Sequence, residues 1–216
     1  MRKSEIVCAA LILISFIAGI YLYSPMPYRM ASHWNISGDV DGYMSKFWGV
    51  FLVPLIAFGL FLLFLIIPHI DPKKHNIEQF RVYYDRFFIV IIVFILYIYL
   101  LTLLWNLNVR FNLIQLMTPA FAVLFYYSGV VISHAKMNWF VGIRTPWTLS
   151  SEKVWNQTHA LGGKLFKITG IIALLGIIFI NYALFFILVP LIVVGIYTVV
   201  YSYFAYREET KMAQKS

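Results

Sequence analysis

The chain has 216 residues, of which 62% are hydrophobic and only 12% are charged, whereas a soluble domain has about 45–50% apolar and about 25% charged residues. This composition excludes an ordinary soluble globular protein and indicates an integral membrane protein. The net charge of +8 requires no nucleic-acid partner, because membrane proteins collect Lys and Arg in their cytoplasmic loops.

Uncharged apolar runs near the length of a membrane-spanning helix, about 20 residues, occur six times. They cover approximately residues 6–23, 47–67, 87–105, 113–133, 168–180 and 182–206. The sequence therefore predicts an all-α polytopic membrane protein with six transmembrane helices. No Asp, Glu, Lys, Arg or His lies inside these runs, which argues against a proton relay or an ion-coupled transporter.

The distribution of positive charge predicts the orientation. Of the 17 Lys and Arg residues, all but Arg29, Lys46 and Arg110 lie in the N-terminus, the second loop, the fourth loop or the tail. The positive side of a membrane protein faces the cytoplasm. Both termini are thus predicted to be cytoplasmic, in a multi-pass protein of the plasma membrane.

The first loop, residues 24–46, is then extracellular. Its N-terminal part alternates loosely and is followed by the turn sequence SGDVDG, so a short hairpin on the membrane surface is expected. Its polar and aromatic side chains are candidate binding residues, namely His33, Trp34, Asn35, Gly38 and Asp41. Asp39 and Asp41 resemble part of a calcium loop, but Trp48 stands where a bidentate Glu is required, so no metal site is predicted.

The second loop contains Asp71 and Pro72, which suit the start of a helix. Aromatic residues at three- and four-residue spacing, among them Phe80 and Tyr84, indicate a helix along the cytoplasmic interface that continues into the third span. No HExxH, GxSxG or phosphate-binding glycine loop occurs anywhere. We therefore predict no enzyme and no cofactor. A metal enzyme built on the four histidines of the cytoplasmic side is the weaker alternative, since their spacing fits no ligand template.

The fourth loop carries the most unusual segment, NWFVGIRTPWTLSSEKVWNQTH. Gly142 permits an unusual backbone conformation, and Pro146 favours an extended Thr145. Arg144 can stack on a nearby indole, bind a lipid phosphate, or pair with a carboxylate such as Glu152 or Asp85. Ser150 or Ser151 can cap a following helix.

That helix is amphipathic, with Val154, Thr158, Leu161 and Leu165 in one stripe. We expect it to lie in the headgroup plane, with Gly162 and Gly163 allowing a bend into the fifth span. Two interpretations remain open for the whole motif, residues 138–167. It is either an interfacial anchor with Arg144 on lipid, or a docking surface for a partner.

The stretch VGIRTPWTLSSEKVW, with TH shortly after it, resembles the signature of the SdpI immunity-protein family. HWNISGDVDGYMSK and PHIDPKKHNI resemble the membrane domain of unknown function that commonly precedes it. The resemblance implies a polytopic membrane protein that protects against a membrane-damaging peptide and can signal by capturing a cytoplasmic regulator. It implies a set of signature positions, here Gly142, Arg144, Thr145, Pro146, Trp147, Glu152 and Trp155.

These observations predict an N-terminal membrane domain over residues 1–85, an SdpI-like membrane domain over 86–206 and a polar tail over 207–216. The expected function is immunity to a membrane-active toxic peptide, combined with a cytoplasmic docking surface. The alternative is a transporter without ion coupling, or a lipid-handling protein. Expected partners are membrane lipids, a secreted toxic peptide and a cytoplasmic regulator protein, without direct contact to nucleic acid.

Overall fold

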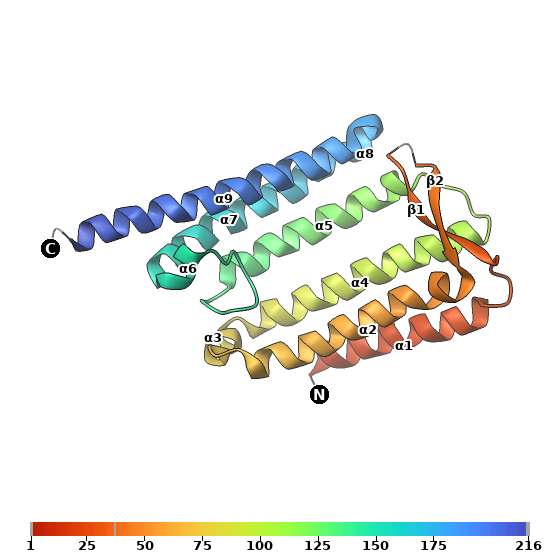
Figure 1. Ribbon diagram of the computed structural model, residues 1–216, viewed down its shortest axis with the longest axis horizontal. Helices are drawn as coiled ribbons and strands as arrows, with labels where there is room; N and C mark the ends of the chain where they lie inside the picture. Colours follow the sequence, from red (N-terminus) through yellow and green to blue (C-terminus); the bar gives the residue numbers. More distant parts are fainter. Residues whose placement is uncertain (1, 37, 215–216) are drawn as a thin grey trace.

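A computed structural model describes residues 2–36 and 38–214 of the chain, and its dominant feature is a bundle of six long helices lying side by side (Figure 1). These are α1 (Lys3–Leu22), α2 (Lys46–Ile70), α4 (Arg81–Asn106), α5 (Leu113–His134), α7 (Glu152–Ala173) and α9 (Ala183–Ala213). Six helical segments of the described chain are long and apolar enough to cross a membrane. The prediction of an all-α protein with six spans is confirmed to that extent.

Short elements gather at the two ends of the bundle (Figure 1). One end, called here the hairpin end, carries β1 (Arg29–Trp34) and β2 (Val40–Ser45). They pair antiparallel from Arg29 opposite Ser45 to Trp34 opposite Val40, with irregular register near His33. The other end, called the termini end, carries α3 (Lys74–Gln79), α6 (Pro146–Ser150) and both chain termini. The short helices α8 (Leu175–Ile178) and η1 (Ile180–Tyr182) connect α7 to α9. The predicted hairpin in the first loop is confirmed.

The helices α1, α2 and α4 pack around an aromatic core. Phe64, Tyr84 and Phe88 lie in it, with ring centroids 4.6–5.4 Å apart. Pro68 lacks an N–H and so leaves the carbonyl of Phe64, one turn earlier in α2, without its helical donor. The buried hydroxyl of Tyr84 donates to that carbonyl at 2.9 Å, which satisfies it where no water is available.

This core corrects the prediction of an interfacial helix in the second loop. The chain forms two helices there, α3 and α4, separated at Phe80. Phe80 and Tyr84 are fully buried, because the break turns α4 toward α2 and brings these rings into the core. The aromatic spacing therefore reports a core-facing helix.

Close approach of α5 and α7 explains two glycines of the second half. A Cβ on Gly129 would lie 2.6 Å from the carbonyl oxygen of Gly163, and Gly163 in turn packs against Ser133. Small residues let membrane helices approach this closely. The helix α7 runs without interruption from Glu152 to Ala173, so the predicted bend at Gly162 and Gly163 is wrong and the fifth span begins earlier than expected.

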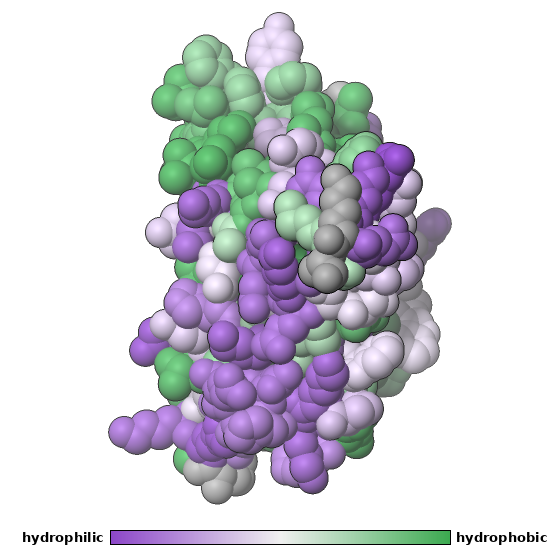
Figure 2. All heavy atoms as spheres, turned by 90° about the vertical axis from the view of Figure 1, so that its left-hand side faces the viewer, coloured by the Kyte–Doolittle hydropathy of each residue, from purple (hydrophilic) through white to green (hydrophobic). Residues whose placement is uncertain are grey.

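The last helix, α9, has 31 residues and is about 46 Å long at 1.5 Å per residue, well beyond the ~30 Å hydrocarbon core. Its C-terminal part projects from the bundle at the termini end (Figure 1). The segment predicted as a polar tail is thus helical as far as Ala213. Figure 2 looks onto the termini end and shows hydrophilic side chains gathered over much of it, as expected of a surface outside the bilayer.

Candidate functional site

The segment between α5 and α6 is folded around one buried side chain, that of Asn138. Its Oδ1 accepts from the backbone N–H groups of Phe140 and Val141 at 2.9 and 2.6 Å, and its amide donates to the carbonyls of Lys136 and Val141 at 2.8 Å each. All four positions of the amide are used, and Asn138 has no exposed surface. One side chain therefore fixes the shape of a loop that has no regular secondary structure.

Gly142 occupies a position that no other residue can take without strain. Its φ is +127°, a conformation that L side chains rarely adopt. A Cβ there would also collide with Nε2 of His159 and lie 3.2 Å from the Trp155 ring. The glycine of the signature is thus explained by backbone conformation and by packing together.

His159 and Trp155, both in α7, pack beneath this loop. Their rings stack with centroids 3.8 Å apart, and the Trp155 indole N–H donates to the carbonyl of Ala135 at 2.8 Å. The N–H of Ile143 donates to His159 Nε2 at 3.0 Å, and His159 Nδ1 lies 2.8 Å from the Trp155 carbonyl. These two contacts place the single ring proton on Nδ1, so the imidazole is neutral and structural.

Thr145 and Pro146 start the short helix α6. The Thr145 hydroxyl accepts from the N–H of Thr148 at 3.2 Å, the Thr148 hydroxyl accepts from the N–H of Thr145 at 2.9 Å, and Pro146 takes the first helical position, where no N–H is needed. The Thr145 hydroxyl also lies 3.0 Å from that of Ser202 in α9. The signature residues therefore join the loop to the last helix.

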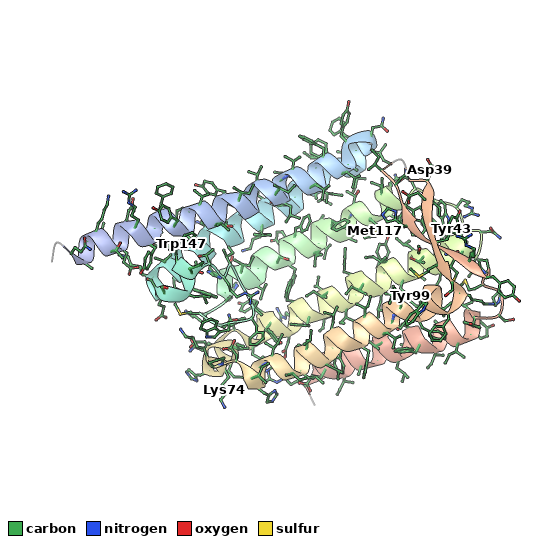
Figure 3. All side chains as sticks on the ribbon, viewed as in Figure 1. Asp39, Tyr43, Lys74, Tyr99, Met117 and Trp147 are labelled. Atoms are coloured by element: carbon green, nitrogen blue, oxygen red, sulfur yellow. The ribbon has the colours of Figure 1, made fainter. Side chains whose placement is uncertain are left out.

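Two further contacts hold this region against α9. The Trp147 ring, on α6, meets Tyr203 edge to face at 5.2 Å, and Figure 3 shows Trp147 beside α9. The hydroxyl of Ser151 donates to the carboxylate of Glu209 and also accepts from the N–H of Val154 at 3.2 Å, capping α7. The predicted cap is confirmed for Ser151.

Arg144 is exposed, and its guanidinium donates to the backbone carbonyl of Trp139. Within the part of the chain that the structure describes, it makes no ion pair with Glu152 or Asp85. Of the three partners considered for Arg144, the carboxylates are not engaged by it: Asp85 contacts Arg2 and Arg81, while Glu152 is exposed in the first turn of α7. Of the signature side chains, those of Arg144 and Glu152 therefore remain available to a ligand.

Asp71 connects this loop to the N-terminal half of the chain. It is only 2% exposed; its Oδ2 accepts from the N–H of Trp139 at 2.9 Å, and its Oδ1 accepts from the N–H of Lys73. The amide of Asn76 donates to the carbonyl of Met137 at 2.7 Å. Sequence reasoning missed Asp71, Asn76, Asn138 and His159 as residues of this site, and only Asp71, before Pro72, and Asn138, before Trp139, offered a local signal.

A network of ion pairs lies beside α3. Arg81, almost fully buried, contacts Glu78 at 3.1 Å, Asp85 at 2.6 Å and Glu5 at 3.9 Å, and Arg2 contacts Glu78 at 3.1 Å. Burial by itself would raise the pKa of Glu78, but the hydrogen bond from Arg2 and the charges of Arg2 and Arg81 outweigh it, so this pKa is lowered. The network ties the N-terminus to α3 and α4.

At the hairpin end, some of the predicted outer-loop residues form the turn of the hairpin and others contact neighbouring side chains. His33 Nδ1 lies 2.5 Å from an Asp41 carboxylate oxygen, Asn35 accepts from the N–H of Asp39 at 3.0 Å, and Gly38 has a φ of +86°. Trp34 meets Trp105 edge to face at 5.7 Å. The described residues contain no group of three His, Cys, Asp or Glu side chains arranged to hold a metal ion.

The fold and the site define a class: a polytopic membrane protein with six helices, a hairpin at one end and a folded GIRTPW loop at the other. Residues 134–202 match the SdpI/YfhL protein family, and residues 10–58 match a domain of unknown function, DUF1648. The resemblance to the SdpI/YfhL family that the signature predicted is thus confirmed over residues 134–202. It is 24% identical over 207 residues to Immunity protein SdpI of Bacillus subtilis (strain 168), covering 95% of this chain and 97% of that protein. No solved structure shows a significant match.

Proposed function

We propose that this chain is a membrane immunity protein that gives resistance to a membrane-active toxic peptide. The observation that carries the proposal is the alignment with Immunity protein SdpI over 95% of this chain and 97% of that relative. An alignment that leaves neither protein with a large unmatched segment supports a shared activity. If only the membrane spans were similar, the segments at the two ends of the bundle would stay outside the alignment.

In this proposal the hairpin end faces outward and the termini end faces the cytoplasm. The positive-inside rule supports this orientation, because Arg29, Lys46 and Arg110 are the only Lys and Arg residues of the sequence assigned to the hairpin end. A secreted peptide then meets the hairpin first. The side chains exposed near its turn include His33 and Asp41.

The proposed docking surface for a cytoplasmic regulator is the Arg144 patch, defined as Trp139, Phe140 and Arg144. Trp139 and Phe140 are 49% and 36% exposed, and aromatic residues with Arg are the side chains that most often dominate protein interfaces. The hydrogen bonds of Asn138 fix the backbone beneath the patch. A preformed surface loses less conformational entropy when a partner binds.

The helix α2 supports communication between the two ends. It begins directly after β2 and ends directly before Asp71, whose carboxylate accepts the N–H of Trp139 in the Arg144 patch. A peptide that binds two arrangements of the hairpin with different affinity would shift α2 and thus the patch. Signalling in this proposal is such a population shift.

Survival of toxin-sensitive bacteria tests the immunity proposal. Cells that lack their own immunity protein are made to express this chain, and survival is measured under increasing concentrations of the peptide. We expect protection by the wild type. Survival equal to that of cells with an empty vector, with membrane insertion of the chain demonstrated, would refute immunity to that peptide.

Paired variants test the docking surface separately. Arg144→Gln removes the charge of the patch, while Lys153→Gln removes an exposed charge at the start of α7 and serves as the matched control. We expect both variants to insert and to protect, and only Arg144→Gln to lose recruitment of a cytoplasmic protein to the membrane. Equal recruitment by both variants would contradict the assignment of the patch.

A further inference from the structure

A polar hollow of about 420 Å³ opens at the hairpin end between the hairpin and the turn that joins α4 to α5. Its size lies within the range of small-molecule sites, about 300–1,000 Å³. Six of its lining residues carry the argument below: Arg29, Tyr43, Trp105, Asn106, Asn108 and Arg110. Figure 3 labels Tyr43 on β2 at this end of the molecule.

The wall of the hollow is fixed by Asn106, at the end of α4. Its amide group accepts from the N–H of Ala31 at 2.8 Å and donates to the carbonyl of Ala31 at 3.0 Å and to that of Thr102 at 2.9 Å. This pairing of a side-chain amide with one backbone residue holds β1 against α4. Two of the elements that line the hollow, β1 and α4, are therefore held together.

Two guanidinium groups from different elements face this space. Arg29 lies over the Tyr43 ring, with 5.6 Å from its Cζ to the ring centroid, and Arg110 lies over the Trp105 ring at 4.8 Å. Arg110 also donates to the Asn108 side chain at 3.1 Å and to the Trp105 carbonyl at 3.2 Å. Aromatic stacking and these hydrogen bonds orient the cations without neutralising them.

The hollow has no negative charge of its own. Neither arginine forms an ion pair with any described carboxylate, and no Asp or Glu lines the hollow. Asp41, on the neighbouring strand, is paired with His33. Lys46, the other cation assigned to this end, donates to the carbonyl of Ser24 at 3.0 Å. Two unneutralised positive charges around one polar space repel each other, so an anion bound between them is favoured.

We propose that this hollow binds a phosphate group held between Arg29 and Arg110. The planar guanidinium fork matches the oxygens of a phosphate, and the flanking Trp105 and Tyr43 are the residues typical of the headgroup region of a bilayer. The phosphate can belong to an anionic lipid or to a soluble phosphate ester. This site lies at the opposite end of the molecule from the Arg144 patch and is independent of the immunity proposal.

Lipid and soluble phosphates are distinguished with the full-length protein in nanodiscs. One arm measures phosphatidylglycerol retained by the protein in native mass spectrometry, against phosphatidylcholine. The other titrates glycerol phosphate into phosphatidylcholine nanodiscs. We expect Arg29→Gln with Arg110→Gln to weaken binding in one arm by at least about tenfold, since each charged hydrogen bond contributes strongly. The control, Arg207→Gln with Lys211→Gln, removes the same charge at the termini end and should change binding less than twofold.

The wild type provides a readout that does not depend on a variant folding. Phenylglyoxal modifies exposed arginines, and a bound phosphate should protect Arg29 and Arg110 but not Arg207. Selective binding of phosphatidylglycerol assigns the site to lipid, and saturable binding of glycerol phosphate assigns it to a soluble ester. No protection of Arg29 and Arg110 by either phosphate, or equal binding by the two double variants, would overturn the proposal.

Discussion

Replacing Gly142 by Ala is expected to destabilise the termini end through two separate costs. The φ of +127° becomes a strained conformation for alanine, at about 1–3 kcal/mol. The new methyl group also overlaps His159 Nε2, so the hydrogen bond from the N–H of Ile143 has to lengthen or break. That N–H is partly buried, and leaving it unpaired costs about 1–3 kcal/mol. The sum is about 2–6 kcal/mol.

Thermal unfolding of the purified protein, followed by tryptophan fluorescence, measures this loss. We expect the midpoint to fall by roughly 5 °C or more. Gly195→Ala in α9 is the matched control, because a Cβ there meets nothing within 4 Å and alanine is the better helix former by about 1 kcal/mol. If Gly142→Ala unfolds at the same temperature as the wild type, the close contact between Gly142 and His159 does not exist as described.

A double-mutant cycle separates the two costs. His159→Ala removes the ring that the new methyl group would meet, but it does not relieve the strained backbone of residue 142. Gly142→Ala should therefore cost at least about 1 kcal/mol less in the His159→Ala background. Equal costs in both backgrounds would mean that the backbone conformation alone requires glycine.

Tyr84→Phe should destabilise the protein by about 1 kcal/mol. The loss should be smaller in the Pro68→Ala background, where a helical N–H is restored to the carbonyl of Phe64. Equal losses in the two backgrounds, measured by the same unfolding assay, would contradict the role given to the Tyr84 hydroxyl. Because the pKa of Glu78 is lowered in the folded protein, its ion pairs stabilise the fold above the ordinary carboxyl pKa of about 4.3 and lose this effect as the pH falls. The wild type should thus unfold at a higher temperature than Glu78→Gln at pH 7, with a gap that closes toward pH 3. A gap that stays constant over this range would show that Glu78 contributes no pH-dependent stability.

The sequence was sufficient to predict what depends on local composition. Six apolar runs predict six spans because the bilayer requires continuous apolar length, and SGDVDG predicts the hairpin because its turn requires residues such as Gly38. The cap at Ser151 follows from the same local chemistry. These features depend on residues close together in the chain.

Features that depend on distant residues escaped prediction. Gly163 suits a bend or a close helix contact equally well, and only its packing against Ser133 of α5 shows that the second applies, whereas Gly162 leaves room for Ile143 of the loop. The sequence offered Arg144 an indole, a lipid phosphate or a carboxylate as a partner, and only the folded loop shows that its guanidinium donates to the carbonyl of Trp139. Asp71 is a plausible helix cap in isolation, and its contact with the N–H of Trp139 joins residues 68 positions apart.

That contact between Asp71 and Trp139 has a consequence for modularity. The segment that matches the SdpI/YfhL family begins at residue 134, so a fragment containing it alone would lack both the carboxylate that accepts the Trp139 N–H and the helix α5 against which α7 packs. Such a fragment, or a chimera that exchanges it between relatives, needs a compatible PHIDPKKHN segment to shape its signature loop. The PHIDPKKHN segment lies outside both matched regions, residues 10–58 and 134–202, so neither region by itself contains the contact that shapes the loop.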